Sequence, residues 1–216
     1  MRGWLSSPCT FKGNGMSDVS ICNLALSHLG DTGIVTAISP PDGSVQAARC
    51  AVFYPHVRSV VLEARDWSFA MLRTTVADLN DPTGSWLYRY ALPSDCVRIS
   101  KVLPEGVGDS EPSEPFVKEI LADGAVTLLT DVENATVLYV RSITDTTKFS
   151  AMFTDCFGWL LASYLAGPII KGKAGTAFGE YCLKRYATML SAAATSDSAQ
   201  HKPKKDYVPP GISARG

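Results

Sequence analysis

The stretch SVQAARCAVFYPHVRSVVLEARDWSFAMLR, residues 44–73, decides the fold together with WLYRYALPSDCVRISK, residues 86–101. Apolar residues in the first stretch recur every three to four positions, which predicts a long helix with a wide buried face. The residues expected on that face are Val45, Ala48, Val52, Val60 and Ala64 in one row and Phe53, Val57 and Val61 in a second. We expect Ser44 to cap the helix, and Pro55 to kink or break it near Val52 because proline lacks an N–H.

The second stretch changes to a period of two. Trp86, Tyr88 and Tyr90 alternate with other residues, which is typical of a strand, and Pro93 and Asp95 then predict a turn before the next strand. The segment Trp67-Ser68-Phe69-Ala70 lies between helix and strands. Its two large side chains bury much apolar area, so we expect a packing centre there.

These motifs resemble a known family. Trp67-Ser68-Phe69-Ala70 followed by Tyr88-x-Tyr90-x-Leu92-Pro93-x-Asp95-Cys96 is similar to the tail tubular protein A family of podophages. That family forms the head-to-tail adaptor rings beneath the phage portal. Ile21–Leu26 with Leu29-Gly30 resembles the family's opening helix, and the likeness in element order covers about residues 16–210. The family often has proline before the tryptophan, where this chain has Asp66, which leaves the geometry of this corner open.

The remaining periodicities complete the predicted fold. Helices are expected at 17–29, at 150–166 with an end at Gly167-Pro168, and at 174–194, and further strands at 116–120, 126–129 and 135–143 around an Asp123-Gly124 turn. The fold class is therefore mostly α with a β insertion: a helical bundle of about four helices carrying a small antiparallel β-region of about five strands, plus an extended C-terminal tail. The predicted boundaries are an N-terminal extension at 1–15, a first helical part at 16–79, the β insertion at 80–148, a second helical part at 149–195 and the tail at 196–216.

Composition excludes some classes of protein. Among 216 residues, 46% are hydrophobic, and 20 basic residues balance 21 acidic ones, so the chain can bury a core but is no basic, nucleic-acid-coating protein. The six cysteines form no CxxC pair, and we expect them to be free and structural. No apolar run approaches the length of a membrane span. Residues 1–15 are either an over-extended start before Met16 or an arm that orders on a partner.

Catalytic signals are weak. Gly167-Pro-Ile-Ile-Lys-Gly-Lys173 matches the phosphate-loop pattern, but a helix is expected before it and Ala174 replaces the required hydroxyl. The three histidines have no zinc-site spacing, so we expect no metal and no cofactor. Glu63 and Asp66 could share a helix face as a carboxylate pair. They keep one alternative open, a peptidoglycan-degrading phage tail or head-completion protein.

The resemblance implies a structural virion protein of the tail or neck, made in the host bacterial cytoplasm and without enzymatic activity. It would form a homo-oligomeric ring of about twelve copies that docks under the portal, links it to the tail tube or nozzle and lets genomic DNA pass without membrane contact. An acidic loop at 104–115, expected to be mobile, would project toward the tail tube. The portal-binding tail would use Lys202, Lys204, Lys205, Tyr207, Pro209 and Pro210, and subunit packing would use Phe153, Phe157, Leu160 and Tyr164. The residues are also compatible with a tail that is simply solvated, and with a monomeric scaffold that recruits a partner through its tail.

Overall fold

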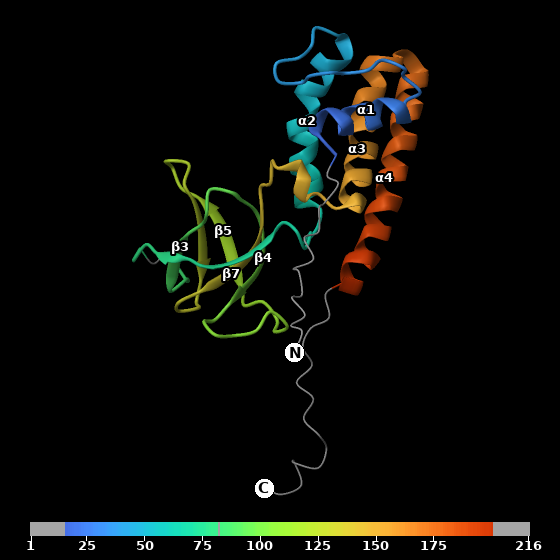
Figure 1. The fold of residues 1–216 in the computed structure, drawn as a ribbon. Helices are drawn as coiled ribbons and strands as arrows, with labels where there is room; N and C mark the ends of the chain where they lie inside the picture. The colour runs from blue at the N-terminus through green and yellow to red at the C-terminus, as the bar shows by residue number, and fades with distance from the viewer. Residues whose placement is uncertain (1–15, 82, 201–216) are drawn as a thin grey trace, which may run out of the picture. The chain divides into compact units, whose positions relative to one another are not determined.

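The computed structural model describes residues 16–81 and 83–200. The chain forms two compact units, and each is described here by itself (Figure 1). The helical unit comprises the chain up to Val61 and Ile143–Leu190, and the β unit comprises Leu62–Ser142, with the chain from Ser191 onward grouped with it. The β unit is therefore inserted into the sequence of the helical unit.

Four helices are present: α1 (Asp18–His28), α2 (Val45–Glu63), α3 (Ala151–Ile170) and α4 (Gly172–Gln200). The predicted N-cap Ser44 is confirmed, because its Oγ accepts from Ala47 N at 3.1 Å. Ser17 caps α1 in the same way, with its Oγ accepting from Ser20 N at 3.1 Å. Gly30, with φ of +72°, supplies the left-handed turn after α1.

Helix α3 is the centre of the helical unit, because it contacts the other three helices. An added Cβ at Gly158 would lie 3.0 Å from the Leu24 side chain, so α1 approaches closely there. The aromatic rings of Tyr54 on α2 and Phe157 on α3 are 4.7 Å apart. On the side of α4, an added Cβ at Gly175 would lie 2.8 Å from the Ala166 carbonyl oxygen. Small residues thus bring α4 to van der Waals distance of α3.

The predicted buried face of α2 is only partly correct. Val57 and Val61 of the second predicted row are fully buried, whereas Val45 and Val52 of the first are each 65% exposed. The helix also continues without a break through Pro55, so the predicted break is wrong. The buried side is fixed by Tyr54 on Phe157, and two apolar rows cannot both face one neighbour.

The predicted end of α3 at Gly167-Pro168 is also wrong. Proline there removes one backbone hydrogen bond in the last turn, and the helix runs on to Ile170. Lys171 and Gly172, with φ of +63° and +60°, end it, and α4 follows at once. The segment that matches the phosphate-loop pattern therefore lies at the end of α3, in the turn between the two helices and at the start of α4. A phosphate-binding loop instead follows a β-strand.

The β unit contains two antiparallel sheets. One has the order β1 (Met71–Thr75), β7 (Thr136–Arg141), β4 (Cys96–Leu103). The other has the order β2 (Ala77–Asp78), β3 (Tyr88–Ala91), β6 (Val126–Thr130), β5 (Phe116–Ile120). Their shared core consists of Tyr90, Ile99, Val102, Leu128, Ala135, Val137 and Tyr139. The predicted hairpin is confirmed, with Gly124 at φ +86° between β5 and β6.

The predicted fold class is wrong. The described residues are 43% helical and about 22% strand, with seven strands in two sheets, which is a mixed α/β fold and not a helix-dominated bundle. The missed strands β1 and β2 lie within 16–79, the range expected to be helical. Strand β1 pairs with β7, about sixty residues later, so no local pattern marks it. The tail was expected to be extended from 196, but α4 continues to Gln200.

Candidate functional site

Three of the four residues predicted for subunit packing form the core of the helical unit. Phe153 and Phe157 are 0% exposed and Leu160 is 3% exposed. Phe153 packs on Phe149, with 4.5 Å between the ring centroids. Only Tyr164 is partly exposed, with its hydroxyl 3.4 Å from His56 Nε2. A neighbouring subunit could therefore reach Tyr164, and the other three side chains stabilise the unit itself.

The helical unit leaves two rows of side chains uncovered. The α2 row consists of the exposed residues Val45, Ala48, Val52 and Pro55. The α4 row consists of the exposed residues Thr176, Glu180, Leu183 and Ala187. In both rows the spacing of three to four residues places the members on one face of the helix. Each row therefore offers a continuous stripe, about three turns long, to a partner.

The aromatic corner is a packing centre, as predicted. Trp67 is 2% exposed, and its carbonyl oxygen accepts from Ala70 N at 2.8 Å and from Met71 N at 3.0 Å. The Arg65 guanidinium lies 5.4 Å from the centroid of the Trp67 ring. This tight turn connects the end of α2 directly to β1.

The second motif fixes the turn between β3 and β4. Cys96 N donates to the Pro93 carbonyl at 3.0 Å, and the Asp95 carbonyl accepts from Ser142 N at 2.7 Å. The Asp95 carboxylate accepts a 3.1 Å hydrogen bond from the Tyr139 hydroxyl on β7. Burial, followed by this bond to Asp95, raises the pKa of Tyr139 to about 12. The motif residues therefore have structural roles within the β unit.

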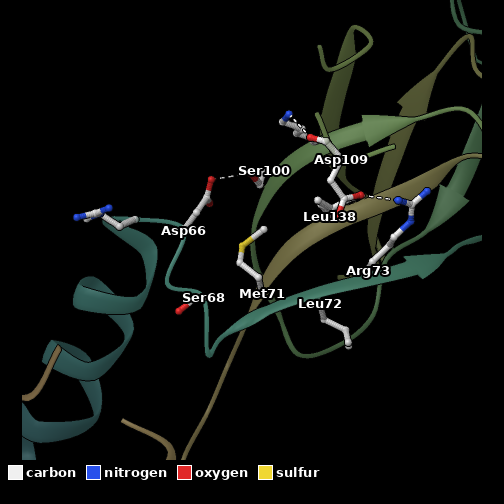
Figure 2. A pocket seen from close by; sticks show the side chains of 10 residues that line it. Asp66, Ser68, Met71, Leu72, Arg73, Ser100, Asp109 and Leu138 are labelled. Atoms are coloured by element: carbon white, nitrogen blue, oxygen red, sulfur yellow. Dashed lines mark hydrogen bonds and ion pairs between the residues drawn. The ribbon is translucent and has the colours of Figure 1, made fainter. Parts of the chain in front are cut away.

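A pocket of about 620 Å³ lies within the β unit (Figure 2). Its apolar wall is formed by Met71, Leu72 and Leu138, and its polar lining residues are Arg65, Asp66, Ser68, Arg73, Ser100, Lys101 and Asp109. No sequence pattern indicates this pocket, because β1, β4 and the 104–115 loop meet only through the sheet pairing.

Two basic side chains that line this pocket, Arg73 and Lys101, bind the 104–115 loop. Arg73 forms an ion pair with Asp109 and also donates to the Val107 carbonyl at 2.7 Å. Lys101 Nζ donates to the carbonyl oxygens of Asp109 and Glu111 at 2.7 and 2.9 Å. These bonds hold the 104–115 loop against the sheet, so it is more firmly anchored than the expected mobile loop.

The structure gives the two carboxylates considered for glycosidic cleavage different surroundings. One Asp66 oxygen pairs with Arg98, and the other accepts from Ser100 Oγ at 2.7 Å. Glu63 is an exposed residue at the end of α2. The contacts to Arg98 and Ser100 fix the orientation of the Asp66 carboxylate toward β4.

Arg89 on β3 was not singled out from the sequence, yet it is the most buried charge in the described part of the β unit. Its side chain is 8% exposed, and it pairs with Asp81 and, at 3.1 Å, with Glu119. Because side chains alternate along β3, Arg89 and Tyr90 point to opposite faces of the sheet. No local sequence signal shows that the face of the sheet with Arg89 is also buried. Its role is to tie β3 to the 81 turn and to β5.

Other predicted features have simple outcomes. The five cysteines in the described ranges are free, and no group of three or more metal-ligating side chains is found among residues 16–81 and 83–200. The expectation that no apolar run approaches the length of a membrane span is wrong, because α3 is long and apolar enough to cross a membrane, alone among the helices of those ranges. More than half of α3 is buried in the protein, as in a central helix. The predicted portal-binding residues of the tail lie outside the described residues.

Comparison with known protein families and with curated proteins finds no match to this chain.

Proposed function

We propose that this chain is a structural virion protein that forms a ring-shaped head-to-tail adaptor beneath a phage portal. The observation that supports the proposal most directly is the position of the two adaptor-like motifs. Trp67-Ser68-Phe69-Ala70 forms the turn from the helical unit into β1, and Asp95 anchors the β3–β4 turn to β7. The two motifs therefore lie where the chain enters the β unit and beside Ser142, where it leaves, and these positions suit an adaptor whose two units meet different partners.

The uncovered rows of the helical unit also support a scaffold that assembles. Val45, Val52 and Leu183 expose 65%, 65% and 50% of their surface, although apolar residues at helical spacing are normally buried. A ring needs two different contact faces on each subunit, repeated until the ring closes. In this role the near-neutral charge suits a passage that lets DNA through without holding it.

In this proposal about twelve copies dock on the portal, and the β unit faces the tail tube or nozzle. The basic tail, residues 201–216, contacts the portal through its lysines and Tyr207. Weak single contacts become stable once a template gathers the copies, because each bound subunit raises the effective concentration of the next. The chain would carry no catalytic group of its own.

Mass photometry of the purified protein, alone and mixed with the portal protein from the same genome, tests this function. About twelve copies added to each portal complex are expected, and removal of residues 201–216 should abolish docking while leaving the fold intact. A chain that begins at Met16 should dock normally. If the protein stays monomeric and never associates with the portal, the adaptor proposal is wrong and a monomeric scaffold replaces it.

A further inference from the structure

We propose that the α2 row of one copy packs against the α4 row of a second copy. The inference rests on the proposed function, because it assigns the contact that would close the adaptor ring. The partner is the same chain, and the two faces are different, so the contact is head-to-tail and repeats.

The first argument is where the two rows lie. Helix α3 contacts α2 through Tyr54 and Phe157, and it contacts α4 at Ala166 and Gly175. The α2 row lies on the side of its helix away from Tyr54. One subunit therefore presents the α2 row and the α4 row from two helices that each flank α3, as a closed ring requires.

The second argument separates the α4 row from the other exposed side of α4. Tyr181 is 47% exposed, but its aromatic ring contacts Trp159 and Phe178 at 6.3 and 5.5 Å in its own chain. Leu183 is 50% exposed and lies about 160° around the helix from Tyr181. Leu183 therefore belongs to the flank of α4 that lacks these aromatic contacts.

The third argument is charge. Arg49 is exposed next to the α2 row, three residues before Val52, and Glu180 is exposed in the α4 row, three residues before Leu183. Within the described part of the chain, neither Arg49 nor Glu180 forms an ion pair. Opposite charges at equivalent positions of two facing helices fix their register and disfavour pairing of like rows.

The direction of the helices makes the register specific. Both α2 and α4 run the same way through the helical unit (Figure 1). Rotation about a ring axis keeps helices that run along this axis parallel, so α2 of one copy meets α4 of the next in parallel. Arg49 then lies beside Glu180, and Val52 beside Leu183. The same offset pairs Val45 with Thr176.

Cross-linking of two single variants tests the contact. Val52→Cys and size-tagged Leu183→Cys are both made in a chain in which Cys9 and Cys96 are replaced by Ser, so that the other native thiols are buried. The two variants are treated with a short bismaleimide, separately and mixed, with and without the portal. A cross-linked product in the mixture at least tenfold above either variant alone is expected. Ile120→Cys, an equally accessible position on the β unit, replaces Val52→Cys in the control and gives the collision level. A cross-linked product from Val52→Cys alone overturns the proposal. So does a yield from the mixture that equals the Ile120→Cys control both with and without the portal.

Charge reversal supplies an independent measurement. Arg49→Glu and Glu180→Arg should each weaken self-association about tenfold, and the double variant should return to within about twofold of the wild type. If self-association of the double variant is weakened by the product of the two single effects, Arg49 and Glu180 do not pair. If the wild type assembles on the portal but these tests fail, the contact is wrong and the adaptor stands. If the contact forms and portal docking never occurs, the adaptor function is wrong instead.

Discussion

The imidazole of His28 on α1 lies flat on the indole of Trp159 on α3, with ring centroids 3.8 Å apart and the planes 5° from parallel. His28 Nε2 is buried, and no side chain or backbone group of the described residues forms a hydrogen bond with it. Burial lowers the pKa of His28 from its ordinary 6.5, while Asp155 raises it and Arg185 lowers it by smaller amounts.

This stack predicts a loss of stability in acid. Because the folded-state pKa is below the unfolded one, the stabilisation is complete above about pH 6.5 and is lost as the pH falls toward the folded pKa. Urea unfolding between pH 8 and pH 5 should show this decline. His28→Phe keeps a flat ring on Trp159 and should flatten the decline, whereas His56→Phe, at an exposed position, should retain it. Equal slopes for His28→Phe and wild type contradict the assignment.

The close approach of α3 and α4 predicts opposite effects for two glycines. A Cβ at Gly175 would lie 2.8 Å from the Ala166 carbonyl oxygen, and Gly175→Ala should cost about 1–3 kcal/mol of unfolding free energy. A Cβ at Gly167 on α3 would meet no atom within 4 Å, and Gly167→Ala should stabilise by up to about 1 kcal/mol. Denaturant titration of both variants checks the difference, and a neutral Gly175→Ala would show that the helices are not in contact.

The Tyr139–Asp95 bond predicts a measurable titration in base. Tyr139 should ionise near pH 12, and since its folded pKa exceeds 10, stability should fall as the pH rises above 10. Asp95→Asn should lower this pKa only partly, because burial is its largest cause. Absorbance at 295 nm follows the ionisation. Tyr139→Phe should cost about 1 kcal/mol by loss of the hydrogen bond.

The anchored loop predicts a change in proteolysis without a large change in stability. Arg73→Ala removes the ion pair to Asp109 and the bond to Val107, so cleavage after Glu105 and Glu111 should accelerate several-fold. The pair is partly exposed, and the unfolding free energy should fall by less than about 1 kcal/mol.

The matched control for that measurement is Arg98→Ala, which breaks a similarly exposed ion pair with Asp66. Loop cleavage in this variant should equal that of the wild type. Acceleration in both variants would mean that general destabilisation, and not the loop anchor, controls cleavage.

Sequence periodicity predicted the elements that depend on near neighbours. The cap at Ser44, the turn at Gly124 and the burial of Trp67 all follow from local chemistry, and all are confirmed. What failed depends on contacts that are distant in sequence. The pairing of β1 with β7 makes a strand of residues whose local pattern resembles the helical segment before them.

The α2 row shows the second reason for failure. Periodicity shows that Val52 is on an apolar stripe, but it cannot choose between two stripes when only one faces α3. The pocket could not be predicted either. Its residues Arg73, Lys101 and Asp109 are far apart in sequence and meet only through strand pairing and one loop. Arg89 is buried by partners at positions 81 and 119, which no spacing rule connects.

Two of the covalent connections into the β unit pass through neighbouring strands. The chain enters the β unit through β1 and leaves through β7, and these strands are antiparallel partners, with Arg141 N donating to the Ala70 carbonyl at 3.0 Å at the shared end. A pull between the units acts on that end and opens the ladder one hydrogen bond at a time, whereas shear would load all the bonds together. Opening of this ladder is itself the first step in unfolding the β unit, so under tension the β unit yields first at the strands by which the chain enters and leaves it.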